Sequence, residues 1–160
     1  MKPYTFAIAL AAVSGSVFAT PINDHAANIS STENTALGIN CRGSFFCGDP
    51  RGAGQVVSRL QGYINDIQNG RVYTNGEHIA CVGRGSLASP NAGFCAFLQG
   101  TNRGVNGAAI RSLIGFIAGH NCKICGSVPI DFPGSNDPKD GILTVNYVTS
   151  TENPCPDGLC

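Results

Sequence analysis

Two segments of the chain carry apolar residues at helical spacing. Within residues 52–69 they recur at steps of three and four, which places them on one face of a helix. Gly70 follows, in the position where a left-handed residue commonly ends a helix. A second stripe runs from about Gly107 to His120, with Asn106 as the expected N-cap. The two stripes are Val56, Val57, Leu60, Tyr63, Ile64 and Ile67, and then Ile110, Leu113, Ile114 and Ile117.

Other segments have the character of strands. The clearest is residues 141–149, where Leu143, Val145 and Tyr147 alternate with residues of the opposite face. Two further strands flank a loop rich in Gly, Ser and Pro, which is the pattern of an antiparallel pair. Together the segments predict an α+β fold, a disulfide-rich sandwich in which two helices pack on one face of an antiparallel sheet. The expected strands are residues 71–73, 77–84, 93–98, a short stretch after Cys122, and 141–149.

The amino terminus has the composition of a secretory signal. Lys2 precedes an apolar run, residues 6–13, that is too short to cross a bilayer. Ala19 then ends a stretch with small residues at the positions that signal peptidase requires. We therefore expect residues 1–19 to be a signal peptide and the mature protein to be secreted into the extracellular space.

The next segment, residues 20–36, is polar and shows neither helical nor strand periodicity. It carries the only N-glycosylation sequon of the chain, at Asn28. A segment of this composition is typical of a polar leader or propeptide. The folded domain is therefore expected at residues 37–160.

The chain has eight cysteines, all within the expected domain. An even number in an exported chain indicates a disulfide framework, and eight cysteines allow 105 pairings. The Cys122-x-x-Cys125 motif also suggests a redox pair or half of a zinc site. However, the motif follows a helix rather than a strand, and free thiolates are rare in an oxidising compartment. We expect structural disulfides among Cys41, Cys47, Cys81, Cys95, Cys122, Cys125, Cys155 and Cys160, with no metal and no cofactor.

Charge is sparse and balanced along the chain. The whole sequence has ten Lys or Arg and ten Asp or Glu, and the part after residue 36 has a net charge of about +1. Such a chain lacks the basic surface that nucleic acids or anionic membranes attract. We therefore expect no nucleic-acid partner and no membrane insertion, and a monomer that recognises its partner by shape and a few local charges.

An enzymatic alternative is a small secreted ribonuclease, which would use a Glu/His pair for proton transfer and an Arg for phosphate. The residues available for it are Glu77, His78, Arg84 and His120. Glu77 and His78 are neighbours in an expected strand, so their side chains point to opposite faces. His120 is better explained as a cation at a helix C-terminus. We therefore expect a protein that is not an enzyme.

A second alternative is a non-catalytic surface-coat protein of the hydrophobin type, because those fungal proteins also carry eight cysteines. Hydrophobins contain adjacent Cys-Cys doublets, and this chain contains none. The two helical stripes also require a globular core to cover them.

Three blocks of sequence carry a resemblance to a known family. The first is LGINCRGS followed by Cys47-Gly48, starting at Leu37. The second is NCKICGS, starting at Asn121, and the third contains LTVNYV, starting at Leu143. In this order they resemble the type-four fungal killer toxin family, whose founding member is encoded by a virus of a smut fungus. Between Gly48 and Gly119 the pattern agrees more than the letters do.

The resemblance implies a sandwich of antiparallel strands with two helices on one face. It also implies that the opening cysteines bond to the C-x-x-C pair, giving Cys41-Cys122 and Cys47-Cys125. Cys81 would bond to Cys155 or Cys160, and Cys95 to the other. The working assignment is Cys81-Cys155 and Cys95-Cys160.

The family consists of secreted toxins that inhibit competing fungi, and its founding member is linked to blockade of calcium channels. The resemblance therefore implies an antifungal toxin or virulence factor with a cell-surface target on a rival fungus or a plant host. The family ties activity to a lysine just before the third shared cysteine, whereas here residues 77–81 contain none. Arg84 is the nearest cation, and Arg42 and Lys123 adjoin the expected disulfides. We take Arg42, Arg84 and Lys123 as the candidate target-binding residues.

Overall fold

The computed structural model describes residues 38–48, 54–85, 89–151, 155 and 157–160, all of them in the compact unit Glu33–Cys160. The expected signal peptide, leader and Asn28 sequon lie outside the described residues. The described elements are η1 (Phe45–Gly48), α1 (Val56–Ile64), β1 (Val72–Tyr73), β2 (His78–Gly83), β3 (Gly93–Gln99), β4 (Val105–Asn106), α2 (Gly107–Gly119), β5 (Gly126–Pro129), η2 (Pro138–Asp140), β6 (Ile142–Val148) and β7 (Gly158–Leu159).

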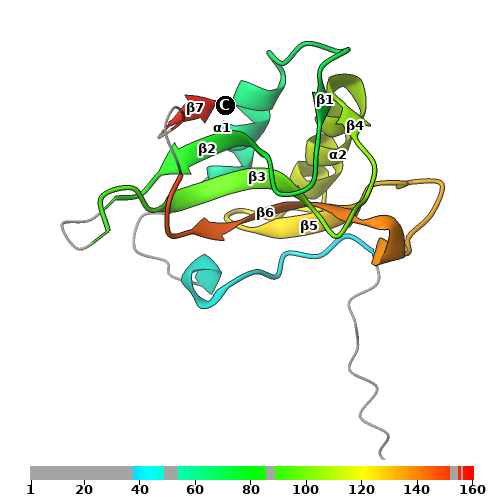
Figure 1. Ribbon diagram of the computed structural model, residues 1–160. Coiled ribbons are helices and arrows are strands. Elements are labelled where there is room, and N and C mark those ends of the chain that lie inside the picture. Colours follow the sequence, from blue (N-terminus) through cyan, green and yellow to red (C-terminus); the bar gives the residue numbers. More distant parts are fainter. Residues whose placement is uncertain (1–37, 49–53, 86–88, 152–154, 156) are drawn as a thin grey trace, which may run out of the picture. The chain divides into compact units, whose positions relative to one another are not determined.

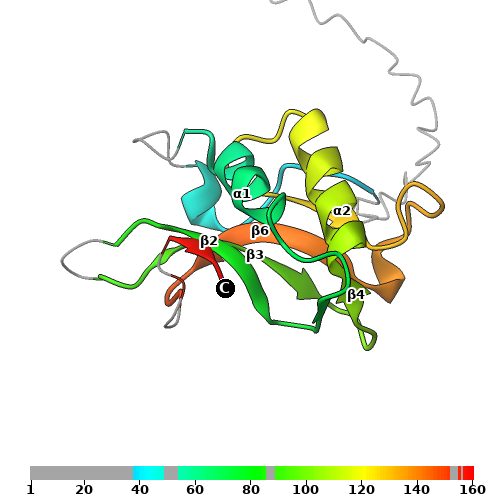
Figure 2. The ribbon, with the colours of Figure 1, turned by 90° about the horizontal axis from the view of Figure 1, so that it is seen from above.

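The main sheet has five antiparallel strands in the order β5-β6-β3-β2-β7. Both α1 and α2 lie over the same face of this sheet, side by side (Figures 1 and 2). The apolar stripes of the two helices and the inward residues of the strands form one continuous core. The predicted α+β fold with two helices on one sheet face is thereby confirmed.

Helix α2 begins and ends where the sequence predicts. The Asn106 side chain caps it by accepting a hydrogen bond from the Ala109 N–H at 2.9 Å. His120 is its C-cap residue. No helix in the part of the chain that the structure describes is long and apolar enough to cross a bilayer.

Helix α1 is shorter than the predicted helix over residues 52–69, and Gly70 is not left-handed. After Ile64 the chain turns and crosses the start of α2, where the carbonyls of Asn69 and Arg71 accept hydrogen bonds from the N–H groups of Ala108 and Gly107. A helix leaves its first N–H groups without internal partners, and this turn satisfies two of them. The chain therefore leaves the helical path after Ile64 and supplies these carbonyls to the start of α2, which makes α1 shorter than predicted.

The register of the strands explains which residues are buried. Leu143 and Val145 of β6 are fully buried in the core, as their alternation predicts. The predicted strand after Cys122 is β5, and it pairs with β6 at one edge of the sheet. The predicted strand over residues 71–73 exists as β1, but it pairs with β4 in a separate two-stranded sheet. The pattern did not indicate the short strands β4 and β7.

Four disulfides link the described residues. Cys41 is bonded to Cys122 and Cys47 to Cys125, which are the pairs that the resemblance implies. The other two bonds require a correction: the working pairs Cys81-Cys155 and Cys95-Cys160 are replaced by Cys81–Cys95 and Cys155–Cys160.

Strand pairing is the physical reason for that correction. Cys81 of β2 lies directly opposite Cys95 of β3, with their Cα atoms 4.1 Å apart. Cys155 and Cys160 are only five residues apart in sequence, and their Cα atoms lie 4.9 Å apart. The four cysteines nevertheless form one cluster, because the sulfurs of Cys155 and Cys160 lie 3.7 and 3.8 Å from that of Cys81.

Candidate target-binding surface

The Cys41–Cys122 and Cys47–Cys125 disulfides attach the opening segment of the domain to the segment between α2 and β5. Their Cα atoms are 5.0 and 5.7 Å apart. The main chain of Asn40 also exchanges two hydrogen bonds with that of Ser127, at 3.0 and 2.8 Å, which covers the outer edge of β5. We call residues 40–48 and 121–125 the stapled surface, because both segments are held by the same two cross-links.

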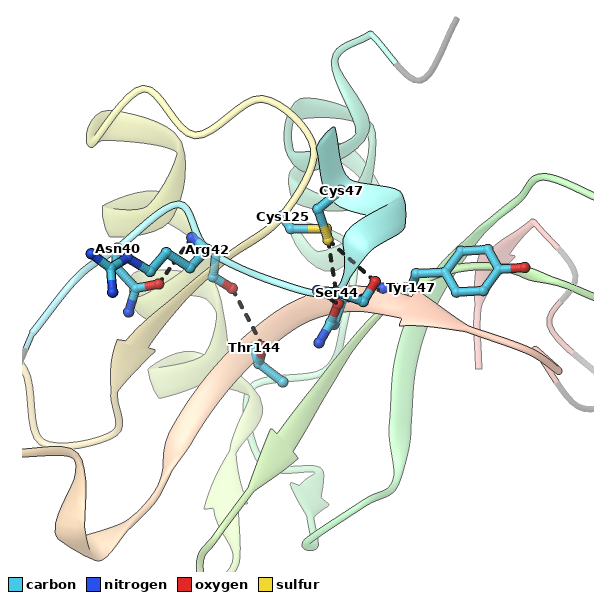
Figure 3. The surroundings of a disulfide bond; sticks show 9 residues. Asn40, Arg42, Ser44, Cys47, Cys125, Thr144 and Tyr147 are labelled. Atoms are coloured by element: carbon cyan, nitrogen blue, oxygen red, sulfur yellow. Dashed lines mark hydrogen bonds between the residues drawn. A yellow bond between two sulfur atoms is a disulfide. The ribbon is translucent and has the colours of Figure 1, made fainter. Parts of the chain in front are cut away.

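Close packing fixes the turn of the stapled surface (Figure 3). The Asn146 side-chain oxygen accepts a hydrogen bond from the Ser44 N–H at 2.9 Å. The Ser44 carbonyl in turn accepts one from the Cys47 N–H at 2.9 Å. A Cβ atom added to Gly43 would clash with the sulfur of Cys47 and lie 2.9 Å from the Cβ of Cys125. Only glycine fits at this position, so the turn has little freedom to move.

Two phenylalanines project from this fixed turn. Phe45 is 91% exposed and Phe46 is 50% exposed, although both are large and apolar. Phe46 packs on Tyr147 with ring centroids 4.3 Å apart, and Tyr147 meets the buried Phe94 at 5.6 Å. Phe45, Phe46, Tyr147 and Phe94 therefore form an aromatic row that leads from solvent into the core. In the sequence, the only signal for Phe45 and Phe46 is their place between two cysteines six residues apart.

Two of the three candidate cations lie on the stapled surface. Arg42 and Lys123 each follow a cysteine of the same disulfide, so their Cα atoms are at most about 13 Å apart. Both residues are exposed, and neither side chain forms an ion pair within the described ranges. Figure 3 shows the Arg42 side chain pointing away from Tyr147, toward Asn40. The two cations therefore lie on the same cross-linked segments as the two phenylalanines of the aromatic row, without contacting its rings in the described structure.

Arg84, the third candidate, is half-buried just after β2. Gly83 pairs with Gly93, and Gly93 pairs with Val148, so Arg84 lies at the end of the sheet where β6 finishes. Two strand spacings of about 4.8 Å separate β2 from β6, so Arg84 lies roughly 10 Å across the sheet from Val148. Register thus places Arg84 at the same end of the sheet as Tyr147, on a separate loop from Arg42 and Lys123.

Two of the four residues considered for a ribonuclease, Glu77 and His78, make contacts within the fold. The Glu77 carboxylate accepts hydrogen bonds from the Thr74 N–H at 2.9 Å and from Arg71 at 3.1 Å. Burial tends to raise the pKa of Glu77, but these hydrogen bonds outweigh it and hold the pKa below its ordinary value. The His78 ring lies against Phe97, with centroids 5.7 Å apart. Glu77 and His78 thus make structural contacts with other residues and are not arranged as an acid–base pair.

A polar pocket of about 410 Å³ lies at the opposite end of the sheet, where β3 ends and β6 begins. An ion pair between Arg103 and Asp131 occupies part of its wall. None of the residues considered for binding or catalysis lines it. Its lining residues are Gly100, Thr101, Asn102, Arg103, Asp131, Lys139 and Asp140.

The cysteines of the C-x-x-C motif are each bonded to a distant cysteine, so they do not form a redox pair with each other. Two groups of His and Cys side chains in the described ranges are close enough to share a metal ion. They consist of His78 with Cys81 and Cys95, and of Cys81 with Cys155 and Cys160. Every sulfur in them belongs to a disulfide and is not available as a thiolate ligand.

Two comparisons show which known proteins this chain is similar to. The family model described as Kp4 matches residues 25–149. The chain is also similar to the KP4 killer toxin of Ustilago maydis P4 virus, at 39% identity over 116 residues. That match covers 72% of this chain and 83% of the toxin. The range of the family model includes both disulfides of the stapled surface and ends just after β6.

Proposed function

This chain belongs to the Kp4 family of killer toxins, and from that membership we propose that it is a secreted, non-catalytic toxin that inhibits the growth of competing fungi. The observation that carries the proposal is the likeness to a killer toxin over most of both chains. A fixed, disulfide-bonded surface with exposed side chains supports action by binding, because a rigid surface loses little entropy when a partner docks.

The proposed target is a protein on the surface of the victim cell, and a calcium channel is the first to test. The founding toxin's link to calcium channels motivates that choice. Arg42, Arg84 and Lys123 are the proposed target-binding residues, because a chain with almost no net charge depends on local cations to attract an anionic channel mouth. The protein is proposed to act as a monomer, without a cofactor and without inserting into the membrane.

Growth assays with the purified protein test the proposal. We expect it to slow fungal growth, and excess calcium to restore growth if a calcium channel is the target. Plant roots treated in parallel distinguish a toxin against rival fungi from one that acts on a host. RNA breakdown in the same samples would instead indicate a ribonuclease. Normal growth of all fungi and roots tested would refute the proposed function.

Single substitutions test the three cations. Arg42→Ala, Arg84→Ala and Lys123→Ala are each compared with Lys139→Ala, which removes an exposed lysine at the opposite end of the sheet. Each variant is first shown to be folded and fully oxidised. We expect the first three to lose potency and Lys139→Ala to retain it. Equal potency of all four variants would show that Arg42, Arg84 and Lys123 do not carry target recognition.

A further inference from the structure

The most exposed large apolar side chain of the described surface, Phe45, is on η1, next to the half-exposed Phe46. Phe45 is 91% exposed, whereas exposed apolar residues elsewhere, such as Val72 at 57% and Leu159 at 42%, are smaller and stand apart from it in sequence. Burying a ring of this size in a partner is strongly favourable, and leaving it in water is not. Its exposure on a turn fixed by a disulfide therefore indicates a function outside the fold.

The contacts beneath Phe45 hold its neighbour Phe46 and the backbone of the turn in place. Its ring meets that of Phe46 edge to face, with centroids 5.9 Å apart. Phe46 rests on Tyr147, and the hydrogen bond from the Ser44 N–H to Asn146 fixes the start of the turn. An anchor that is already ordered loses little conformational entropy when it binds.

A protein pocket fits this surface better than a lipid bilayer does. A single fourteen-carbon acyl chain gives only marginal membrane binding, and two phenylalanines, one of them already half covered, bury less apolar area. Attraction to anionic lipids would need a cluster of cations, whereas the domain carries a net charge of about +1. An interface with an aromatic centre and a charged rim is typical of protein recognition.

The two cations of the stapled surface indicate the chemistry expected around the aromatic anchor. Arg42 lies three residues before Phe45, and Lys123 is joined to the same segment through the Cys41–Cys122 disulfide. Within the described ranges, neither side chain is neutralised by an acidic partner. Carboxylates on the partner would complement them.

We propose that Phe45 and Phe46 are the anchor of the target-binding surface and insert into an apolar pocket, rimmed by acidic groups, on a protein exposed by the target cell. This inference rests on the proposed function and names the side chains that would carry the affinity. It also assigns Arg42 and Lys123 to the rim, where charges mainly set the association rate and its dependence on salt.

Binding of labelled protein to susceptible fungal cells tests the inference. From the apolar area that each ring would bury, Phe45→Ser is expected to weaken binding by about 30-fold and Phe46→Ser by about fivefold. Val72→Ser is the matched control, because it makes the same kind of change at an exposed apolar site on β1. Circular dichroism and a non-reducing peptide map verify that all variants are folded and oxidised. Phe45→Leu, which keeps the apolar bulk, should recover most of the affinity.

Two further arms identify the partner. Cells treated with protease should lose binding, and vesicles of phosphatidylcholine with or without phosphatidylserine should not bind the protein. Binding to vesicles that depends on Phe45, or undiminished binding to protease-treated cells, would overturn the inference in favour of lipid or another non-protein partner. Equal binding by Phe45→Ser and Val72→Ser would also overturn it. If the wild-type protein neither binds nor inhibits any fungus, the proposed function itself fails; if it does both while the Phe variants are unaffected, only this inference fails.

Discussion

The Cys41–Cys122 and Cys47–Cys125 disulfides close two overlapping loops that share residues 47–122, and their contributions to stability should therefore depend on each other. The bonded residues are 81 and 78 apart in sequence. In the loop-entropy model, one cross-link of this span disfavours the unfolded chain by about 4.5 kcal/mol. Once it is present, the second bond closes a ring of only about ten residues, because the two cross-links are six residues apart on one side and three on the other. That ring adds about 2.7 kcal/mol by the same model.

The perturbation is the removal of each bond separately and then of both. Cys41→Ala with Cys122→Ala, or Cys47→Ala with Cys125→Ala, should each lower the free energy of unfolding by about 2.7 kcal/mol. Removing both bonds should lower it by about 7 kcal/mol, which exceeds the sum of the two separate losses. Loss of the buried sulfurs of Cys122 and Cys125 adds a packing cost that is the same in both contexts and cancels in the comparison.

Urea unfolding followed by far-UV circular dichroism measures these free energies. The control is removal of the Cys155–Cys160 bond, which closes a short loop outside the two overlapping loops. Its removal is expected to cost about 2 kcal/mol and should add independently to either loss. The reasoning is refuted if removal of either bond of this pair alone costs about 4.5 kcal/mol, or if the two losses simply add when both bonds are removed.

Three further changes test the packing and electrostatics of the fold. Asn106→Ala removes the cap of α2 and should cost about 1 kcal/mol in urea unfolding; no loss would show that the cap is dispensable. Ile114→Ala opens a cavity at a fully buried position and should cost about 3 kcal/mol in the same assay, whereas a cost below 1 kcal/mol would mean that the core collapses around it. The pKa of Glu77 lies below its ordinary 4.5, so its ionised form stabilises the fold above that pH, and the benefit is lost as the pH falls through the folded pKa. The Glu77→Gln variant should therefore lose less stability than the wild type when the pH falls below about 4.5, as measured by thermal unfolding. Parallel pH profiles of the two proteins would contradict this.

Local pattern was sufficient for some parts of the fold and not for others. The alternation in β6 and the cap at Asn106 are local signals, and the structure follows both. The early end of α1 depends on α2, which lies some 40 residues further along the chain, and no pattern within residues 52–69 reveals it. The pairing of Cys81 with Cys95 depends likewise on the register of two strands. Residue types could suggest Arg42 and Lys123 as a site, but the exposure of Phe45 follows only from the path of the stapled turn.

At each edge of the main sheet the last hydrogen-bonded segment is short and adjoins a disulfide. Asn40, next to Cys41, bridges the outer edge of β5, and β7, next to Cys160, pairs with β2. If these disulfides were reduced, the segments at Asn40 and β7 would detach and leave unpaired main-chain groups along each edge of the sheet. Such edges readily join to those of neighbouring molecules. We therefore expect oxidation to protect the solubility of the protein as well as its conformation. In a reducing medium the protein should aggregate edge to edge rather than persist as separate unfolded chains.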